Sequence, residues 1–85
     1  MKNKILITIY VPMIEDSFDI YIPIVKRVGV IKRMIIKVAE EYNDSAFAGK
    51  NYFRNLYDKV TGEMIDDNEF VKYSKIKNGS KLILY

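Results

Sequence analysis

Cysteine, histidine and tryptophan are all missing from this 85-residue sequence. Without cysteine, the chain can form no disulfide, no thiolate metal site and no cysteine nucleophile. Without histidine, it also lacks the side chain that most often serves as a general base in enzymes. Ser45, Ser74 and Ser80 therefore have no histidine to activate them, and no pair of carboxylates stands out as catalytic. We do not expect an enzyme.

Sequence motifs for metal and phosphate binding are missing as well. The acidic run Asp66-Asp67-Asn68-Glu69 lacks the alternating oxygen ligands and terminal glutamate of a calcium loop. We interpret it as a solvated turn or a helix cap. The stretch from Ser45 to Lys50 contains a Gly-Lys pair, but without the glycine spacing of a phosphate-binding loop. We expect neither a metal nor a cofactor.

Charge is only weakly one-sided, because 14 lysines and arginines are balanced by 11 aspartates and glutamates, a net charge of +3. Some cations do cluster in the sequence, namely Lys26, Arg27, Lys32, Arg33 and Lys37. A nucleic-acid-binding module that uses this basic surface is one alternative. We favour the interpretation that these side chains form a solvated, lysine-rich surface.

Long hydrophobic runs are missing too, and none approaches the roughly 20 residues that a membrane-spanning helix needs. The apolar stretch from Ile5 to Val11 follows two lysines but is interrupted by Thr8 and Tyr10. No small-residue cleavage site follows it before Pro12, so we interpret it as a strand and not as a secretory signal. The length predicts a single domain over residues 1–85. We expect a cytoplasmic location without direct membrane insertion.

The most strongly periodic segment runs from Val28 to Asn43 and predicts a helix. Its apolar residues recur at helical spacing, which places them on one stripe: Ile31, Met34, Ile35, Val38 and Tyr42. We expect this stripe to pack on a sheet. Ile36 lies outside the stripe, so we expect it to be exposed beside the lysines or covered by a partner.

Two strands are predicted before this helix. The first runs from Lys4 to Val11, where alternation sets an inward row, Ile5, Ile7, Ile9 and Val11, against an outward row, Lys4, Leu6, Thr8 and Tyr10. The second follows a polar turn and ends at Ile22, with Phe18, Ile20 and Ile22 inward. Strands so close together in sequence predict a hairpin.

Shorter elements are predicted after the helix. We expect a strand over Tyr52 to Tyr57, a very short one at Met64-Ile65, and a helical turn around Phe70 to Tyr73. Asn78-Gly79 is a strong turn signal. It precedes a last strand, Ser80 to Tyr85, that turns Leu82 and Leu84 inward.

The predicted order is therefore β-β-α-β-(β)-β, with the aliphatic first and last strands at the centre of the sheet. Those strands would be parallel, which needs a long connection, and the helix supplies part of it. The fold class is α+β: a mixed sheet of four to five strands with one helix across one face, as in the β-grasp.

Parts of the sequence resemble ubiquitin-like proteins. In the stretch Glu69 to Tyr85, an aromatic helical turn leads through an isoleucine and a polar turn into a strand with alternating leucines. Leu56-Tyr57-Asp58 and the loop Gly62 to Asp67 are similar to the third strand and following loop of these proteins.

Size, the pattern from Ile5 to Val11 and the ending Ile76 to Tyr85 most resemble the YukD/EsaB-type proteins of bacterial type VII (WXG-type) secretion systems. The resemblance implies a cytoplasmic accessory or regulatory component that binds a protein of the secretion machinery. A conjugated modifier would end in Gly-Gly, whereas this sequence ends in Leu84-Tyr85. We therefore expect no conjugation. The alternative is a sulfur carrier or modifier truncated at its C-terminal tail.

If the helix covers one sheet face, the other face should collect the outward residues of the strands. These are Leu6, Thr8, Tyr10, Tyr21, Tyr57, Ile83 and Tyr85, although irregular alternation leaves the facing of Tyr57 open. A contiguous apolar and aromatic surface of this kind is typical of interaction sites. We predict that it binds a protein partner or a second copy of the chain. The alternative is that cross-strand Tyr–Ile pairs merely stiffen the sheet.

Overall fold

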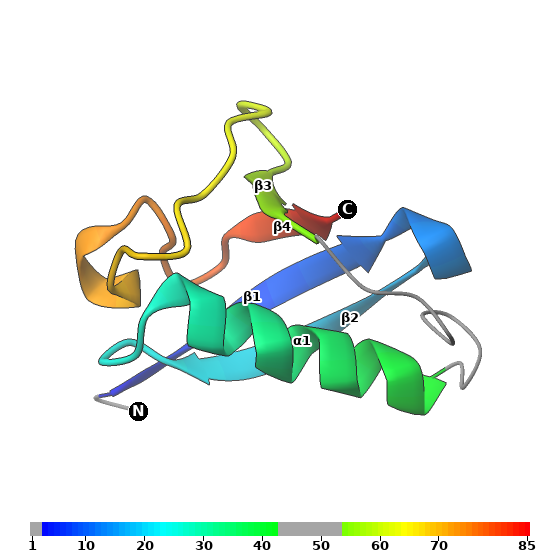
Figure 1. Cartoon of the computed structure of the whole chain (residues 1–85), viewed down its shortest axis with the longest axis horizontal. Coiled ribbons are helices and arrows are strands. Elements are labelled where there is room, and N and C mark those ends of the chain that lie inside the picture. Colours follow the sequence, from blue (N-terminus) through cyan, green and yellow to red (C-terminus); the bar gives the residue numbers. More distant parts are fainter. Residues whose placement is uncertain (1–2, 43–53) are drawn as a thin grey trace.

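The fold begins with a hairpin that leads into a single long helix. The computed structural model describes residues 3–42 and 54–85. Its elements in chain order are β1 (Lys4–Val11), η1 (Pro12–Ile14), β2 (Asp16–Pro23), α1 (Val28–Tyr42), β3 (Leu56–Asp58), η2 (Val71–Tyr73) and β4 (Lys81–Leu84) (Figure 1). Pro12 ends β1 as expected, because proline cannot donate a ladder hydrogen bond.

The strands form one four-stranded sheet in the order β2-β1-β4-β3. β1 pairs with β2 along its whole length in antiparallel register, and with β4 in parallel register over Thr8 to Tyr10. β3 closes the far edge, antiparallel to β4. The α+β β-grasp prediction, with the first and last strands central and parallel, is confirmed.

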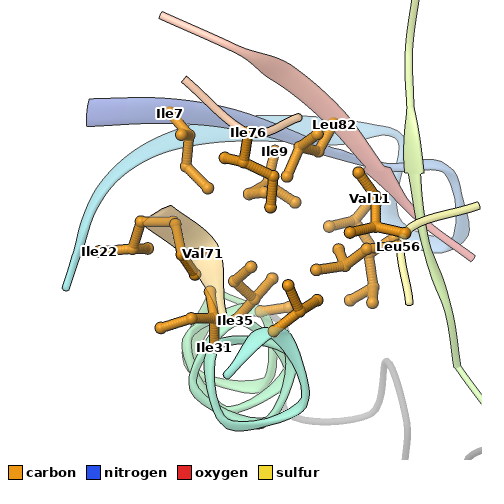
Figure 2. Packing of buried hydrophobic residues seen from close by; sticks show 14 of the residues in the cluster. Ile7, Ile9, Val11, Ile22, Ile31, Ile35, Leu56, Val71, Ile76 and Leu82 are labelled. Atoms are coloured by element: carbon orange, nitrogen blue, oxygen red, sulfur yellow. The ribbon is translucent and has the colours of Figure 1, made fainter. Parts of the chain in front are cut away.

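The core lies between α1 and one face of the sheet. Alternation along β1 buries Ile7, Ile9 and Val11, while Ile5 is partly buried against the same cluster. Figure 2 shows Ile31 and Ile35 pointing from α1 toward the strands that carry Ile7, Ile9 and Leu82. The rest of the buried apolar cluster comprises Phe18, Ile22, Val28, Ala39, Leu56, Ile65, Val71, Ile76 and Leu84. The residues predicted to point inward from β1, β2 and β4 thus lie on the face of the sheet that α1 covers.

The buried stripe of α1 differs from the predicted one. Met34 is 37% exposed, whereas Ala39 is fully buried beside Ile35. Ile36, expected outside the core, is partly buried against it. At about 100° per residue, Ala39 lies about 40° from Ile35 on the helix surface and Met34 about 100° away. The helix is therefore rotated relative to the predicted stripe. The Tyr42 side chain lies outside the described residues.

The N-terminus of α1 is held by backbone carbonyls, in a helix whose sequence offers no Ser, Thr or Asp cap. The N–H of Val28 donates to the Glu69 carbonyl at 2.8 Å and that of Gly29 to the Asp67 carbonyl at 2.9 Å. Lys32 Nζ also meets Asp67 Oδ2 at 2.6 Å. The acidic run is thus a turn that caps the helix, as Figure 1 shows by the closeness of this segment to the start of α1.

The segment between β3 and β4 is irregular yet contributes Ile65, Val71 and Ile76 to the core. The predicted helical turn is η2, and Gly79 has the positive φ, 87°, that the predicted turn requires. Met64 forms an isolated bridge with Tyr57 in place of a strand. β3 starts at Leu56, and Tyr52 and Phe53 lie outside the described residues. No described helix is long and apolar enough to span a membrane.

Candidate functional site

The sheet face opposite α1 gathers the residues predicted for it from all four strands. Cα partners across the sheet are Leu6 and Tyr21, Tyr10 and Ile83, and Tyr57 and Ile83. Side chains of directly paired residues lie on the same face, so Tyr57 belongs to this face too. Tyr85 follows β4, and its ring meets the Tyr57 ring edge-on, with centroids 6.1 Å apart.

Exposure differs across this surface, which we call the open face. Tyr21 and Tyr85 are the most exposed of its predicted residues, at 51% and 60%. The others are half-buried by their neighbours: Leu6, Thr8, Tyr10, Tyr57 and Ile83. Thr8 Oγ1 donates to Asp19 Oδ1 at 2.7 Å, so this hydroxyl is used within the sheet. A polar row of Asp19, Thr8 and Lys81 therefore crosses this face. It separates the Leu6–Tyr21 pair from the larger apolar and aromatic group, which comprises Tyr10, Tyr57, Ile83 and Tyr85.

Cations also belong to the open face, and the predicted surface omitted them. Lys59 Nζ lies 5.5 Å from the centre of the Tyr10 ring, within the range of a cation–π contact. Lys81 is the Cα partner of Thr8, and Lys4 is the partner of Pro23. Strand alternation does predict that Lys4 and Lys81 point outward, although neither was counted in the predicted binding surface. Lys59 follows β3 in an irregular segment, where no periodicity fixes its direction.

A hollow of about 330 Å³ opens at the β3–β4 end of this face. It is lined by Tyr57, Asp58, Lys59, Gly62, Ile83 and Tyr85. The Asp58 carboxylate accepts hydrogen bonds from the N–H groups of Val60 and Thr61, at 2.8 and 3.0 Å. It is thus engaged in the turn that forms the rim. The hollow is a concave apolar site with an ammonium group beside it.

A second hollow lies where β1 and β4 end and β3 begins. It has a volume of about 290 Å³ and is lined by Pro12, Met13, Arg54, Leu84 and Tyr85. Arg54 Nη2 lies 3.5 Å from the sulfur of Met13, which is 48% exposed. Tyr85 lines both hollows and joins them into one surface.

The basic surface around α1 is partly used within the molecule. Arg27 Nη1 donates to the Asn68 carbonyl at 2.8 Å, and its guanidinium carbon lies 4.5 Å from the centre of the Phe70 ring. Lys32 is paired with Asp67. These contacts hold the acidic turn and η2 against the helix, whereas Lys26, Arg33 and Lys37 are exposed. Some cations of this surface therefore stabilise the fold, and the others face solvent.

An exposed pair, Lys75 and Glu63, shows a pKa shift with a clear cause. Lys75 Nζ donates to Glu63 Oε2 at 2.6 Å, and this hydrogen bond, followed by the attraction of the same carboxylate, raises the pKa of Lys75. Both side chains are exposed to solvent. The raised pKa keeps Lys75 in its ammonium form, which is not nucleophilic. Among residues 3–42 and 54–85, no group of three or more Asp or Glu side chains is placed to hold a metal ion.

The comparisons with known proteins show the fold. No family model and no curated protein matches this chain. A structure from work on molecular mimicry of SUMO in promoting DNA repair has a TM-score of 0.70 at 17% identity, over 98% of this chain and 91% of that one. The ubiquitin-like domain of an Arabidopsis thaliana protein has a TM-score of 0.66 at 19% identity, over 98% and 77%.

An N-terminal ubiquitin-like domain, that of the 4931431F19Rik protein, is similar as well, with a TM-score of 0.70 at 17% identity, over 98% of this chain and 74% of that one. Such identities carry the fold and nothing of partners or activity. The chain has a ubiquitin-like β-grasp fold.

Proposed function

We propose that this ubiquitin-like domain is a protein-binding accessory or regulatory component without enzymatic activity, and that it binds through the open face. The observation that supports this most is the gathering of apolar and aromatic side chains from all four strands on the face that α1 leaves bare. Tyr21 and Tyr85 remain more than half exposed there. Exposed aromatic residues around an apolar centre are typical of protein interfaces.

The finer part of the proposal is a cytoplasmic role beside a bacterial type VII (WXG-type) secretion system, without conjugation to other proteins. Its support is the resemblance of Ile5 to Val11 and of Ile76 to Tyr85 to YukD/EsaB-type proteins. We expect the gene to lie beside genes for a secretion ATPase and WXG-type proteins. A neighbourhood with neither would remove this part and leave the binding role standing.

The alternatives have direct tests. A nucleic-acid-binding module would show salt-sensitive binding to an oligonucleotide at low ionic strength; its absence would dismiss that role. A sulfur carrier or modifier truncated at its tail predicts an endogenous protein longer than this sequence. An intact mass of the endogenous protein that corresponds to a chain ending at Tyr85 would remove that role.

The binding role is tested by substitutions on the open face. We expect Tyr10→Asp and Ile83→Asp to abolish capture of a protein from the native host, because each places a charge at the apolar centre. Tyr85→Ala should weaken capture without disturbing the fold, since this side chain is 60% exposed. Met34→Asp, on the exposed side of α1, is the matched control. Unchanged capture by folded Tyr10→Asp and Ile83→Asp variants would show that the site is wrong.

A further inference from the structure

We infer that the segment bound by the open face carries an apolar anchor side chain flanked by carboxylates, with the anchor seated between Tyr57, Ile83 and Tyr85 and a carboxylate beside Lys59. This inference rests on the proposed function, since it names the kind of partner for the same face. It combines the shape of the hollow with the charge around it.

The hollow suits an apolar anchor because aromatic and aliphatic side chains line it. Ile83 and Tyr57 are half-buried at adjacent positions of β4 and β3. The Tyr85 ring stands nearly perpendicular to that of Tyr57, at 87°. Gly62 leaves the rim open, since a Cβ built on it would meet nothing within 4 Å. A side chain that fills such a concave apolar site is the usual anchor of a protein interface.

The charge of the open face favours an acidic partner. Its carboxylates already accept hydrogen bonds from this chain, Asp19 from Thr8 and Asp58 from the turn N–H groups. Hydrogen bonds from neutral groups leave the formal charge of both carboxylates in place, but three lysines, Lys4, Lys59 and Lys81, outnumber them. The ion pairs found in residues 3–42 and 54–85 join other lysines, Lys32 to Asp67 and Lys75 to Glu63. The ammonium groups of Lys4, Lys59 and Lys81 are therefore free to meet carboxylates of a partner.

Other occupants fit this face less well. A second copy that docked face to face would bring the lysines of both chains together, which like-charge repulsion opposes. Single-stranded nucleic acid needs ring faces on which bases can stack. Here Lys59 lies over the Tyr10 ring, and Tyr57 and Tyr85 pack edge to face. A peptide segment needs only the hollow and the neighbouring charges.

Selection from a random 12-residue peptide library displayed on phage, against the full chain, tests the inference without a known partner. We expect enriched peptides to share a Leu, Ile or Phe next to Asp or Glu, and to shift the NMR amide signals of Tyr57, Ile83 and Tyr85. Lys59→Glu should weaken their binding about 5- to 10-fold, and added NaCl should weaken it further. Lys37→Glu, on the exposed side of α1, should bind them like the unchanged chain.

The outcomes separate the inference from the proposed function. Enriched neutral or basic peptides that bind the open face, or binding unaffected by Lys59→Glu, would overturn the inference and leave the binding role intact. Peptides whose signals map to α1, or a selection that enriches nothing, would overturn both. Displacement of the peptides from the open face by oligodeoxythymidine at equal concentration would overturn the inference in favour of nucleic acid.

Discussion

Met34 and Ile35 are sequence neighbours with opposite surroundings, which makes them a matched test of the core. Ile35 is fully buried and Met34 is 37% exposed. We expect Ile35→Ala to lower the free energy of unfolding by about 2–4 kcal/mol, because it leaves a cavity under the sheet. Met34→Ala should cost less than about 1 kcal/mol. Urea denaturation measures both, and equal losses would contradict the observed rotation of α1.

That rotation shows what apolar periodicity can and cannot determine. Periodicity correctly predicted a helix with one buried side, and Ile31 and Ile35 lie in the core. Periodicity wrongly placed Met34 in the buried stripe, because a large apolar side chain is expected to be buried wherever it fits the helical spacing. Ala39 was overlooked because it is small, yet a small side chain suits a position where the helix comes close to the sheet.

The pair of Lys75 and Glu63 gives a prediction about pH. Since the pKa of Lys75 is raised above 10.5 in the folded chain, the stability that this pair contributes is fully present below that pH and is lost as the pH rises through the raised pKa. We expect the urea midpoints of the unchanged chain and of Lys75→Met to differ more at pH 8 than at pH 12. A difference that grows with pH would contradict the assignment.

At the scale of elements, the docking of the acidic turn on α1 can be tested by comparing the ion pairs. Lys32 and Asp67 have exposed fractions of 15% and 43%, against 66% and 56% for Lys75 and Glu63, at the same distance of 2.6 Å. A double-mutant cycle with Lys32→Met and Asp67→Asn should give a coupling of about 0.5–1.5 kcal/mol. The cycle with Lys75→Met and Glu63→Gln should give a smaller one. The reverse order would contradict a structural role for the turn.

Elements with strong local signals were predicted well, and those held by distant contacts were not. Alternation was enough for β1, β2 and β4, and Asn78-Gly79 for the turn before β4. The short β3 and the irregular segment after it have no period. Their course depends on contacts such as the Ile65 N–H donating to the Leu56 carbonyl at 2.8 Å and the Val71 N–H donating to that of Lys26 at 2.9 Å. Backbone hydrogen bonds between residues far apart in sequence cannot be predicted from the spacing of residue types.

For the whole molecule, the strand order predicts where local opening is hardest. β1 lies between β2 and β4, and Ile7 and Ile9 are fully buried. We expect their amides to exchange with solvent most slowly, at the rate of global unfolding, and those of the three-residue edge strand β3 to exchange faster. Hydrogen exchange followed by NMR measures this. Faster exchange in β1 than in β3 would contradict the central position of β1.

The composition of the open face was largely predictable, because strand alternation alone assigns most of its residues. Tyr57 was ambiguous until its pairing with Ile83 was known. Lys59 needed the three-dimensional structure, since only the turn after β3 brings it over Tyr10. Alternation therefore predicted the facing of most of the apolar residues and of Lys4 and Lys81, whereas the position of Lys59 could not be predicted.

The central claim is that the open face, and not α1, meets a protein partner. It is tested most directly by photo-crosslinking in the native host, with p-benzoylphenylalanine placed at Tyr21, at Tyr85 or, as control, at Met34. These sites are 51%, 60% and 37% exposed. We predict that the Tyr21 and Tyr85 probes crosslink to the same protein, identified by mass spectrometry, and that the Met34 probe does not. A protein that crosslinks to the Met34 probe, with none crosslinking to the Tyr21 and Tyr85 probes, would contradict this claim.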